Sequence, residues 1–244
     1  TGNSRTLRYP EHSNLLASYP FNGNTNDDSG NGNDLTPYGG VALTHDRFGS
    51  VRSAYKFDGN DDYLISKTNF TGLEDELTIE LWFYKPENWE SEYQKLIGTG
   101  TKSGWGFLIS QGPSGNMRLY SHVRNLSGIS QFTGTNNSPV PDQWHHVVLT
   151  YDGNKEILYL DGIKVGEISQ SGNISEPGEL KIGWVYKTEY FNGKLDDINI
   201  SQKALDSSQV LMRSSIVKLD TSIPTLASVT LNSSNNSQTL AKPG

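Results

Sequence analysis

The sequence predicts an all-β protein folded as a two-sheet antiparallel sandwich, and three observations lead to this prediction. Many short segments alternate apolar and polar residues with period two, as expected of strands with one buried face. Turn signals made of Gly, Asn and Asp separate these segments. Only residues 203–214 carry a helix-like pattern. Short strands without a helix between each pair are typical of an antiparallel sandwich and not of βαβ units.

The strand segments are rich in β-branched and aromatic residues, which suit a pleated, half-buried surface. We expect turns at Asp58–Asn60, Asp152–Asn154 and Asp161–Gly162. We expect strands at residues 77–84, 106–110, 117–121, 145–151, 156–160, 180–183 and 195–200. We expect a core that includes Phe57, Leu81, Trp82, Val148 and Leu160, with Trp144 buried in the same way.

The composition sets limits on function. The chain has 244 residues, enough for one large β-domain. Its net charge is −7 and its pI is about 5.2, which disfavours nucleic acid and anionic membranes as partners, because both need a basic surface. No apolar run approaches the roughly 18 residues of a membrane span. Cysteine is absent, which excludes disulfides, thiolate zinc sites and cysteine nucleophiles.

The composition changes near the ends of the chain. We expect residues 1–14 to be a linker and residues 15–218 to form the sandwich domain. Leu226–Leu231 has the pattern of one further strand, followed by a polar Ser/Asn run. Because a single strand cannot form a domain, residues 219–244 are expected to be a linker and the first strand of a following module in a longer protein.

The segment from Tyr19 to Asp34 has the composition of a cation-binding loop, since Asn, Asp and Gly follow an apolar lead-in. Carboxylate, amide and backbone carbonyl oxygens are the ligands of Ca²⁺, which takes six to eight of them at about 2.3–2.6 Å. The alternative is a solvated turn, because the same residue types favour turns for local backbone reasons. The composition of the loop leaves both possibilities open.

Four stretches in order resemble the laminin G-like family of the concanavalin A-like lectin/glucanase superfamily. They are Phe21–Asn33, Phe57–Leu64, Trp144–Gly153 and Phe191–Ile200. The resemblance covers roughly residues 15–214 and implies a concanavalin A-like jelly roll whose first and last strands lie side by side. The tail, residues 220–244, is similar to the opening of immunoglobulin-like repeats in bacterial surface proteins.

The resemblance also implies a structural Ca²⁺ ion near the Asp/Asn loop and the last strand. Asp28 in the loop and Asp196 in the last strand are the carboxylates expected to bind it. Asn31, Asn33 and backbone oxygens near Gly23 are expected to supplement them.

Catalysis is not expected, although the superfamily includes glycoside hydrolases. Those enzymes place two carboxylates about 5–9.5 Å apart across the scissile bond. Glu76 and Glu80 share one face of a predicted strand, but Thr78 stands between them and nothing else supports a site. His145 and His146 are adjacent in a strand, so their side chains point to opposite faces and cannot bind one metal ion together.

Aromatic residues beside the predicted loops are the candidates for ligand contact. An exposed ring can stack on the apolar face of a sugar, while amides and carboxylates bind the hydroxyls. Alternatively, these rings close the ends of the sandwich. The candidates are Trp184, Tyr186, Tyr190, Asn192, Trp105 and Trp89, with Trp184 and Tyr186 as the leading pair.

The sequence therefore predicts a non-catalytic, extracellular or cell-surface binding module within a larger bacterial protein. Calcium is expected to stabilise it, and carbohydrate or another surface protein is the expected partner, without nucleic-acid binding or membrane insertion. The alternative is a protein–protein adhesion or spacer module without a sugar site, because fold does not determine function. A glycoside hydrolase is a more remote alternative.

Overall fold

The computed structural model describes residues 14–87, 93–101, 104–112, 119–124, 133–134, 138–175, 178–186 and 188–215. The predicted terminal linker and the following strand lie almost wholly outside these ranges, so they stay predictions. None of the helices in the described residues has the length and hydropathy that a membrane-spanning helix requires.

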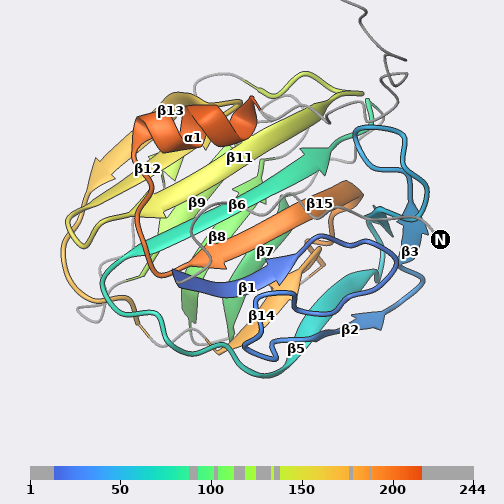
Figure 1. The fold of residues 1–244 in the computed structure, drawn as a ribbon, viewed down its shortest axis with the longest axis horizontal. Helices are drawn as coiled ribbons and strands as arrows, with labels where there is room; N and C mark the ends of the chain where they lie inside the picture. Colours follow the sequence, from blue (N-terminus) through green and yellow to red (C-terminus); the bar gives the residue numbers. More distant parts are fainter. Residues whose placement is uncertain are drawn as a thin grey trace, which may run out of the picture.

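Two antiparallel sheets face each other, as the sequence predicts (Figure 1). The first sheet has eight strands. Its order is β13 (Ile163–Ser169), β12 (Lys155–Leu160), β11 (Trp144–Tyr151), β6 (Leu77–Tyr84), β15 (Asn192–Ser201), β4 (Ala54–Asp58) and β3 (Ala42–Thr44). The eighth strand, β1 (Leu15–Tyr19), pairs with the far half of β15, with Tyr19 opposite Ile198. The first and last strands are therefore adjacent, as the resemblance implied.

The second sheet has seven strands. Its order is β10 (Thr133–Gly134), β9 (Leu119–Val123), β8 (Gly104–Gln111), β7 (Gln94–Thr101), β14 (Glu179–Ile182), β5 (Tyr63–Asn69) and β2 (Leu35–Tyr38). Sequence neighbours such as β14 and β15 belong to different sheets, so the connections cross between the layers at the ends of the sandwich.

Strand β6 shows how the alternation builds the core. Leu77, Ile79, Leu81 and Phe83 are fully buried between the sheets. Because successive side chains point to opposite faces, Leu81 and Trp82 cannot both face this core. Trp82 is half-buried on the outer face, where its ring stacks on His146 at a centroid distance of 4.9 Å.

Three of the predicted core positions therefore differ from the expectation. The prediction was wrong for Trp82 and also for Trp144, which is half-buried and packs on Tyr84 at 5.9 Å. Val148 is buried, but in a separate cluster on the outer face of the first sheet. Phe57 and Leu81 lie in the main core, and Leu160 is partly buried against it.

The single described helix, α1 (Ser207–Ser214), lies over the outer face of the first sheet near β12 and β13 (Figure 1). Asp206 caps its first turn by accepting from the N–H groups of Ser208 and Gln209, and the Gln209 side chain accepts from the Asp206 N–H. This reciprocal capping box satisfies donors that a helix start leaves unpaired. Val210 of α1 packs in the outer cluster with Val148 and Tyr159.

Candidate functional site

Three connections meet at one end of the sandwich and form the candidate site. Tyr38 pairs with Tyr63 in the β2–β5 register, Gly40 N–H donates to Asp62 Oδ1, and Asn192 pairs with Asp58. The turn between β14 and β15 begins at Gly183, whose φ is +81°. A Cβ atom there would lie 2.4 Å from the Phe57 ring, so glycine allows this close approach.

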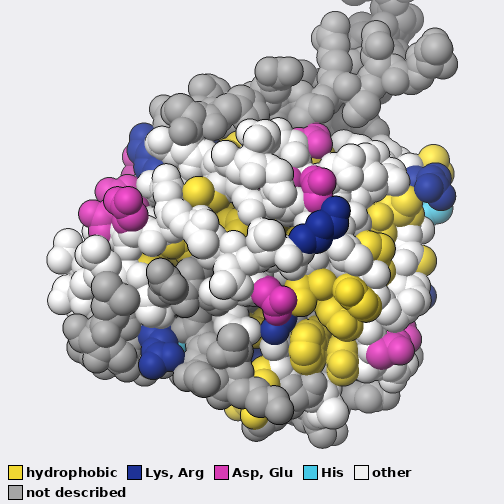
Figure 2. Space-filling model, turned by 90° about the horizontal axis from the view of Figure 1, so that it is seen from below, with side chains coloured by type: hydrophobic (Ala, Val, Ile, Leu, Met, Phe, Trp, Pro, Cys, Tyr) yellow, Lys and Arg dark blue, Asp and Glu magenta, His cyan; other side chains and the backbone are white. Residues whose placement is uncertain are grey.

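The aromatic platform, defined as Tyr38, Tyr63, Trp184 and Tyr190, covers this end of the second sheet. Trp184 and Tyr190 stack with ring centroids 5.7 Å apart and planes at 15°. Tyr63 lies 5.1 Å from Trp184 and stacks on Tyr38 at 4.9 Å and 4°. Tyr38 is 47% exposed and the other three are half-buried. Viewed from the side of β2, β5 and β14, hydrophobic side chains gather in a patch with acidic and basic side chains beside it (Figure 2).

Charged groups border the platform. The Lys181 ammonium lies 5.0 Å from the Trp184 ring centroid and donates to Gly100 O at 3.1 Å. Glu179 lies 3.8 Å from the same ammonium, so the positive charge is balanced within the protein. The platform is therefore an apolar surface without excess positive charge.

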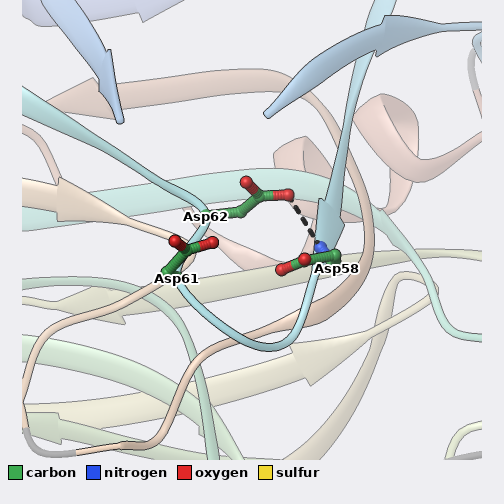
Figure 3. A group of neighbouring side chains, drawn as sticks. All are labelled: Asp58, Asp61 and Asp62. Atoms are coloured by element: carbon green, nitrogen blue, oxygen red, sulfur yellow. Dashed lines mark hydrogen bonds between the residues drawn. The ribbon is translucent and has the colours of Figure 1, made fainter. Parts of the chain in front are cut away.

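The acidic turn, defined as Asp58, Asp61 and Asp62 (Figure 3), directly precedes Tyr63 of the platform. One carboxylate oxygen from each side chain lies within 4.8 Å of the others, which is a spacing that could hold a metal ion. Asp62 is 3% exposed and accepts from the N–H groups of Gly40 and Asp58. Asp58 accepts from the backbone and side-chain N–H groups of Asn60 at 2.8 and 3.0 Å.

The protonation of the two bonded carboxyls differs. Burial raises the pKa of Asp62; the Gly40 N–H opposes this effect, and the negative charge of Asp58 adds to it. Partial burial acts to raise the pKa of Asp58 as well, but the N–H groups of Asn60 and Asp61 outweigh it and hold that pKa below its ordinary value. A bound cation would relieve the repulsion between these carboxylates.

The loop that the sequence singled out as a calcium site is held by hydrogen bonds within the protein. Asn31 and Asn33 donate side-chain N–H bonds to the carbonyls of Leu15 and Leu16 in β1. Asp28 and Gly23 are exposed; the Asp28 N–H donates to Ser18 O at 2.8 Å, and the Gly23 N–H donates to Phe21 O.

The centre of this loop is Asp27, which the sequence did not single out. Its Oδ1 accepts from the N–H groups of Ser18 and Ser29, and its Oδ2 accepts from Ser29 Oγ and Asn33 N–H, all at 2.9–3.0 Å. The four bonds close the loop onto β1.

The structure gives Asp196 an arginine partner. Arg47 lies 3.3 Å from Asp196 Oδ2 and 2.6 Å from Asp197 Oδ2, with its guanidinium 4.4 Å from the ring centroids of both Phe48 and Trp82. Burial and the neighbouring charge of Asp197 raise the pKa of Asp196 well above its usual value, although Arg47 opposes them. Asp28 and Asp196 thus belong to two different networks.

Two of the six predicted ligand-contact residues, Trp184 and Tyr190, lie together in the platform, and Asn192 borders the acidic turn. Tyr186 is half-buried in the same connection. Trp89 and the side chain of Trp105 lie outside the described residues. Sequence reasoning missed Tyr38 and Tyr63, although Tyr63 directly follows the acidic turn.

The structure gives the acidic and histidine residues of the predicted strands partners within the protein. The Glu80 carboxylate is buried and accepts from Arg213 and Asn199 at 2.7 and 3.1 Å, while Glu76 accepts from Ala204 N–H. The two histidines point to opposite faces: His145 contacts the Phe83 ring and His146 the Trp82 ring.

The sheet order defines a concanavalin A-like jelly roll. The connections that meet at one end of it form a candidate binding surface. The model of the concanavalin A-like lectin/glucanases superfamily, Laminin_G_3, matches residues 57–211. The chain belongs to this family. The family match ends at residue 211, so the immunoglobulin-like resemblance of residues 220–244 stays a prediction.

Solved structures share the fold at low sequence identity. Domain 4 of AbnA, a GH43 extracellular arabinanase from Geobacillus stearothermophilus solved with arabinotriose, is 22% identical with a TM-score of 0.66; the match covers 82% of this chain and 98% of that one. The binding domain of Paraclostridial Mosquitocidal Protein 1 is 20% identical with a TM-score of 0.69, at 83% and 52% coverage.

The binding domain of botulinum neurotoxin DC, solved with SialylT, is 15% identical with a TM-score of 0.67, and the match covers 84% of this chain and 51% of that one. The chain thus spans about half the length of both toxin domains. No curated protein matches it significantly.

Proposed function

We propose that this domain is a non-catalytic carbohydrate-binding module whose site is the aromatic platform. The observation that carries the proposal is the stacked pair of Trp184 and Tyr190 at a loop end, beside Tyr63 and next to the carboxylates of the acidic turn. Rings present an apolar surface to the C–H face of a sugar. Asp61 and Asn192 provide polar groups of the kind that bind sugar hydroxyls.

The comparisons support the proposal at the level of the fold. One relative was solved with arabinotriose, and others are toxin binding domains. The same relatives, an extracellular arabinanase and toxins, support an extracellular or cell-surface location for this module.

We further propose that Ca²⁺ binds at the acidic turn and stiffens the border of the platform. The convergence of three carboxylates, with no cationic side chain among the contacts found for these residues, supports this assignment. The set Asp28, Asp196, Asn31, Asn33 and Gly23 stays the competing prediction for a calcium site.

The test is a glycan-array screen of the wild type, with and without chelator, followed by titration of Trp184→Ala with the best glycan. An aromatic contact contributes about 0.5–1.5 kcal/mol beyond its buried area, so we expect binding to weaken several-fold to some tens of fold. The matched control is Trp144→Ala, which removes a half-buried tryptophan from the outer face of the other sheet.

Unchanged glycan binding by Trp184→Ala together with a large loss of stability would identify Trp184 as a plug of the sandwich end. Absence of any glycan ligand for the wild type would favour the adhesion or spacer module instead.

A further inference from the structure

A hollow lies on the outer face of the first sheet. We name it the β11–β12 recess: it has a volume of about 340 Å³ and lies between β11, β12 and the segment that leads into α1. This volume falls at the lower end of the range of about 300–1,000 Å³ that is usual for small-ligand pockets. The lining residues are Thr150, Asp152, Lys155, Ile157, Tyr159, Ala204, Leu205, Asp206 and Ser207.

Two hydroxyls distinguish the recess from an ordinary surface depression. Thr150 and Tyr159 are each only 3% exposed. Neither hydroxyl has a hydrogen-bond partner in the described part of the chain. Neither belongs to the fully buried polar atoms without a partner, so both hydroxyl oxygens can be reached from the recess. Such groups normally find partners, because an unpaired buried hydroxyl costs free energy. Both hydroxyls are therefore available to a molecule in the recess.

The charges on the rim restrict what that molecule is. Asp152 and Asp206 line the recess, and each uses Oδ1 to accept backbone N–H groups. The opposing charge, Lys155, lies 3.1 Å from Glu167, which also binds Lys164. The carboxylates of Asp152, Asp206 and Glu167 outnumber the ammonium groups of Lys155 and Lys164, so the charges at the rim disfavour an anion. Carboxylate oxygens accept well from hydroxyl or ammonium donors.

Tyr159 keeps its proton in this setting. Burial raises the pKa of the Tyr159 phenol, so the hydroxyl both donates and accepts at neutral pH. Ile157 and Leu205 add an apolar floor. An apolar floor with hydroxyls and carboxylates at the rim matches the mixed surface of a sugar ring.

We propose that the β11–β12 recess binds a single non-anionic sugar unit through the hydroxyls of Thr150 and Tyr159. This site is separate from the platform. Thr150 lies at the end of β11 that pairs with Thr78, whereas the platform adjoins the start of β15, whose Lys194 pairs with Tyr84 at the other end of β6. Two sites on one module would raise the avidity for a polymeric glycan without any new contact.

The test is nuclear magnetic resonance titration of the ¹⁵N-labelled domain carrying Trp184→Ala, so that the platform does not contribute. The probes are methyl glycosides of glucose, galactose, mannose and arabinose, together with glucosamine and glucuronate. We expect saturable shifts of the amides at residues 150, 155–159 and 204–207 with at least one neutral or amino sugar, and none with glucuronate. Binding should be weak, because one ring makes few contacts.

Tyr159→Phe and Thr150→Val each remove one hydroxyl and keep the shape of the side chain. Each should weaken binding roughly fivefold, as expected for one neutral hydrogen bond. The matched control, Tyr55→Phe, removes the hydroxyl of another buried tyrosine in the same sheet that does not line the recess, and should leave the affinity unchanged.

Absence of saturable shifts at the recess with every neutral and amino sugar would overturn the proposal. Binding of glucuronate alone, or undiminished binding by both hydroxyl variants, would do the same. Since all these titrations lack Trp184, none of the outcomes depends on whether the platform binds glycans.

Discussion

Glu80 of β6 and Arg213 of α1 form an ion pair of 2.7 Å that joins residues 133 positions apart. Their side chains are 2% and 13% exposed. The pair anchors α1 to the outer face of the first sheet, beside the β11–β12 recess, and Asn199 of β15 gives Glu80 a further hydrogen bond. Burial raises the pKa of Glu80, and the charge of Arg213 opposes that rise.

The first prediction concerns this pair. Arg213→Ala should destabilise the domain by about 3–5 kcal/mol near neutral pH, because it leaves a buried carboxylate uncompensated. The loss should shrink in acid, where Glu80 takes up a proton. Met212→Ala is the control, since Met212 is 56% exposed in the same helix and should change stability little. Denaturant unfolding at two pH values measures both effects; equal losses at both would contradict a charge mechanism.

His145 leads to a prediction about the pH dependence of stability. Its Nδ1 lies 2.7 Å from Asp161 Oδ2 and its Nε2 lies 2.8 Å from Val140 O. A carbonyl and a carboxylate both accept, so the two contacts favour the imidazolium form, in which both ring nitrogens donate. Burial acts to lower the pKa of His145, but the hydrogen bonds to Asp161 and Val140 outweigh it and raise that pKa above 6.5.

Because the folded-state pKa is raised, the stabilisation by His145 is fully present below about pH 6.5 and disappears as the pH rises through the folded pKa. The melting temperature of the wild type should therefore fall as the pH rises from about 6.5 through the folded-state pKa. His145→Gln should flatten this dependence of the melting temperature on pH. His146 is the internal control: burial and the charge of Arg47 lower its pKa to about 3, so it stays neutral throughout. An unchanged slope in His145→Gln would assign the transition to another group.

The third prediction tests the loop between β1 and β2. Asp27→Asn replaces one acceptor oxygen by an NH₂ group. In one orientation this group faces the Ser29 hydroxyl and the Asn33 N–H, and in the other it faces the N–H groups of Ser18 and Ser29. We expect a loss of about 1–3 kcal/mol, the cost of leaving such groups unsatisfied. Asp28→Asn, at an exposed neighbour, should have little effect. Thermal unfolding of the two variants checks this, and a reversed order would mean that Asp27 is not the centre of the loop.

The fourth prediction separates the two calcium sites. Ca²⁺ should raise the melting temperature of the wild type, because it binds the folded state. If it binds at the acidic turn, Asp61→Asn abolishes the shift and Asp28→Asn keeps it. The sequence-based site predicts the opposite pattern. Asp61 suits this test because it is exposed, so its substitution should leave the fold intact.

The sequence by itself determined where most strands lie and that the domain is built of strands. The period-two alternation along residues 77–84 and the turn signals around Gly59 and Gly162 depend only on local geometry, so they are readable without the fold. The family motifs further implied that β1 lies beside β15, which the register confirms. The Trp184–Tyr190 region also stood out, because aromatic residues beside turns are visible in the chain.

Only the tertiary structure decided which face each residue occupies and which distant groups meet. Alternation shows that Leu81 and Trp82 point apart, but not which of the two faces the other sheet. Tyr38 and Tyr63 join the platform because β2 pairs with β5. Asp196 meets Arg47 because a bulge in β15, with Asp197 at φ +43°, turns both carboxylates toward the β3–β4 loop. Such contacts are long-range, since they depend on how strands pair across the sheets and not on the residues next to them in the chain.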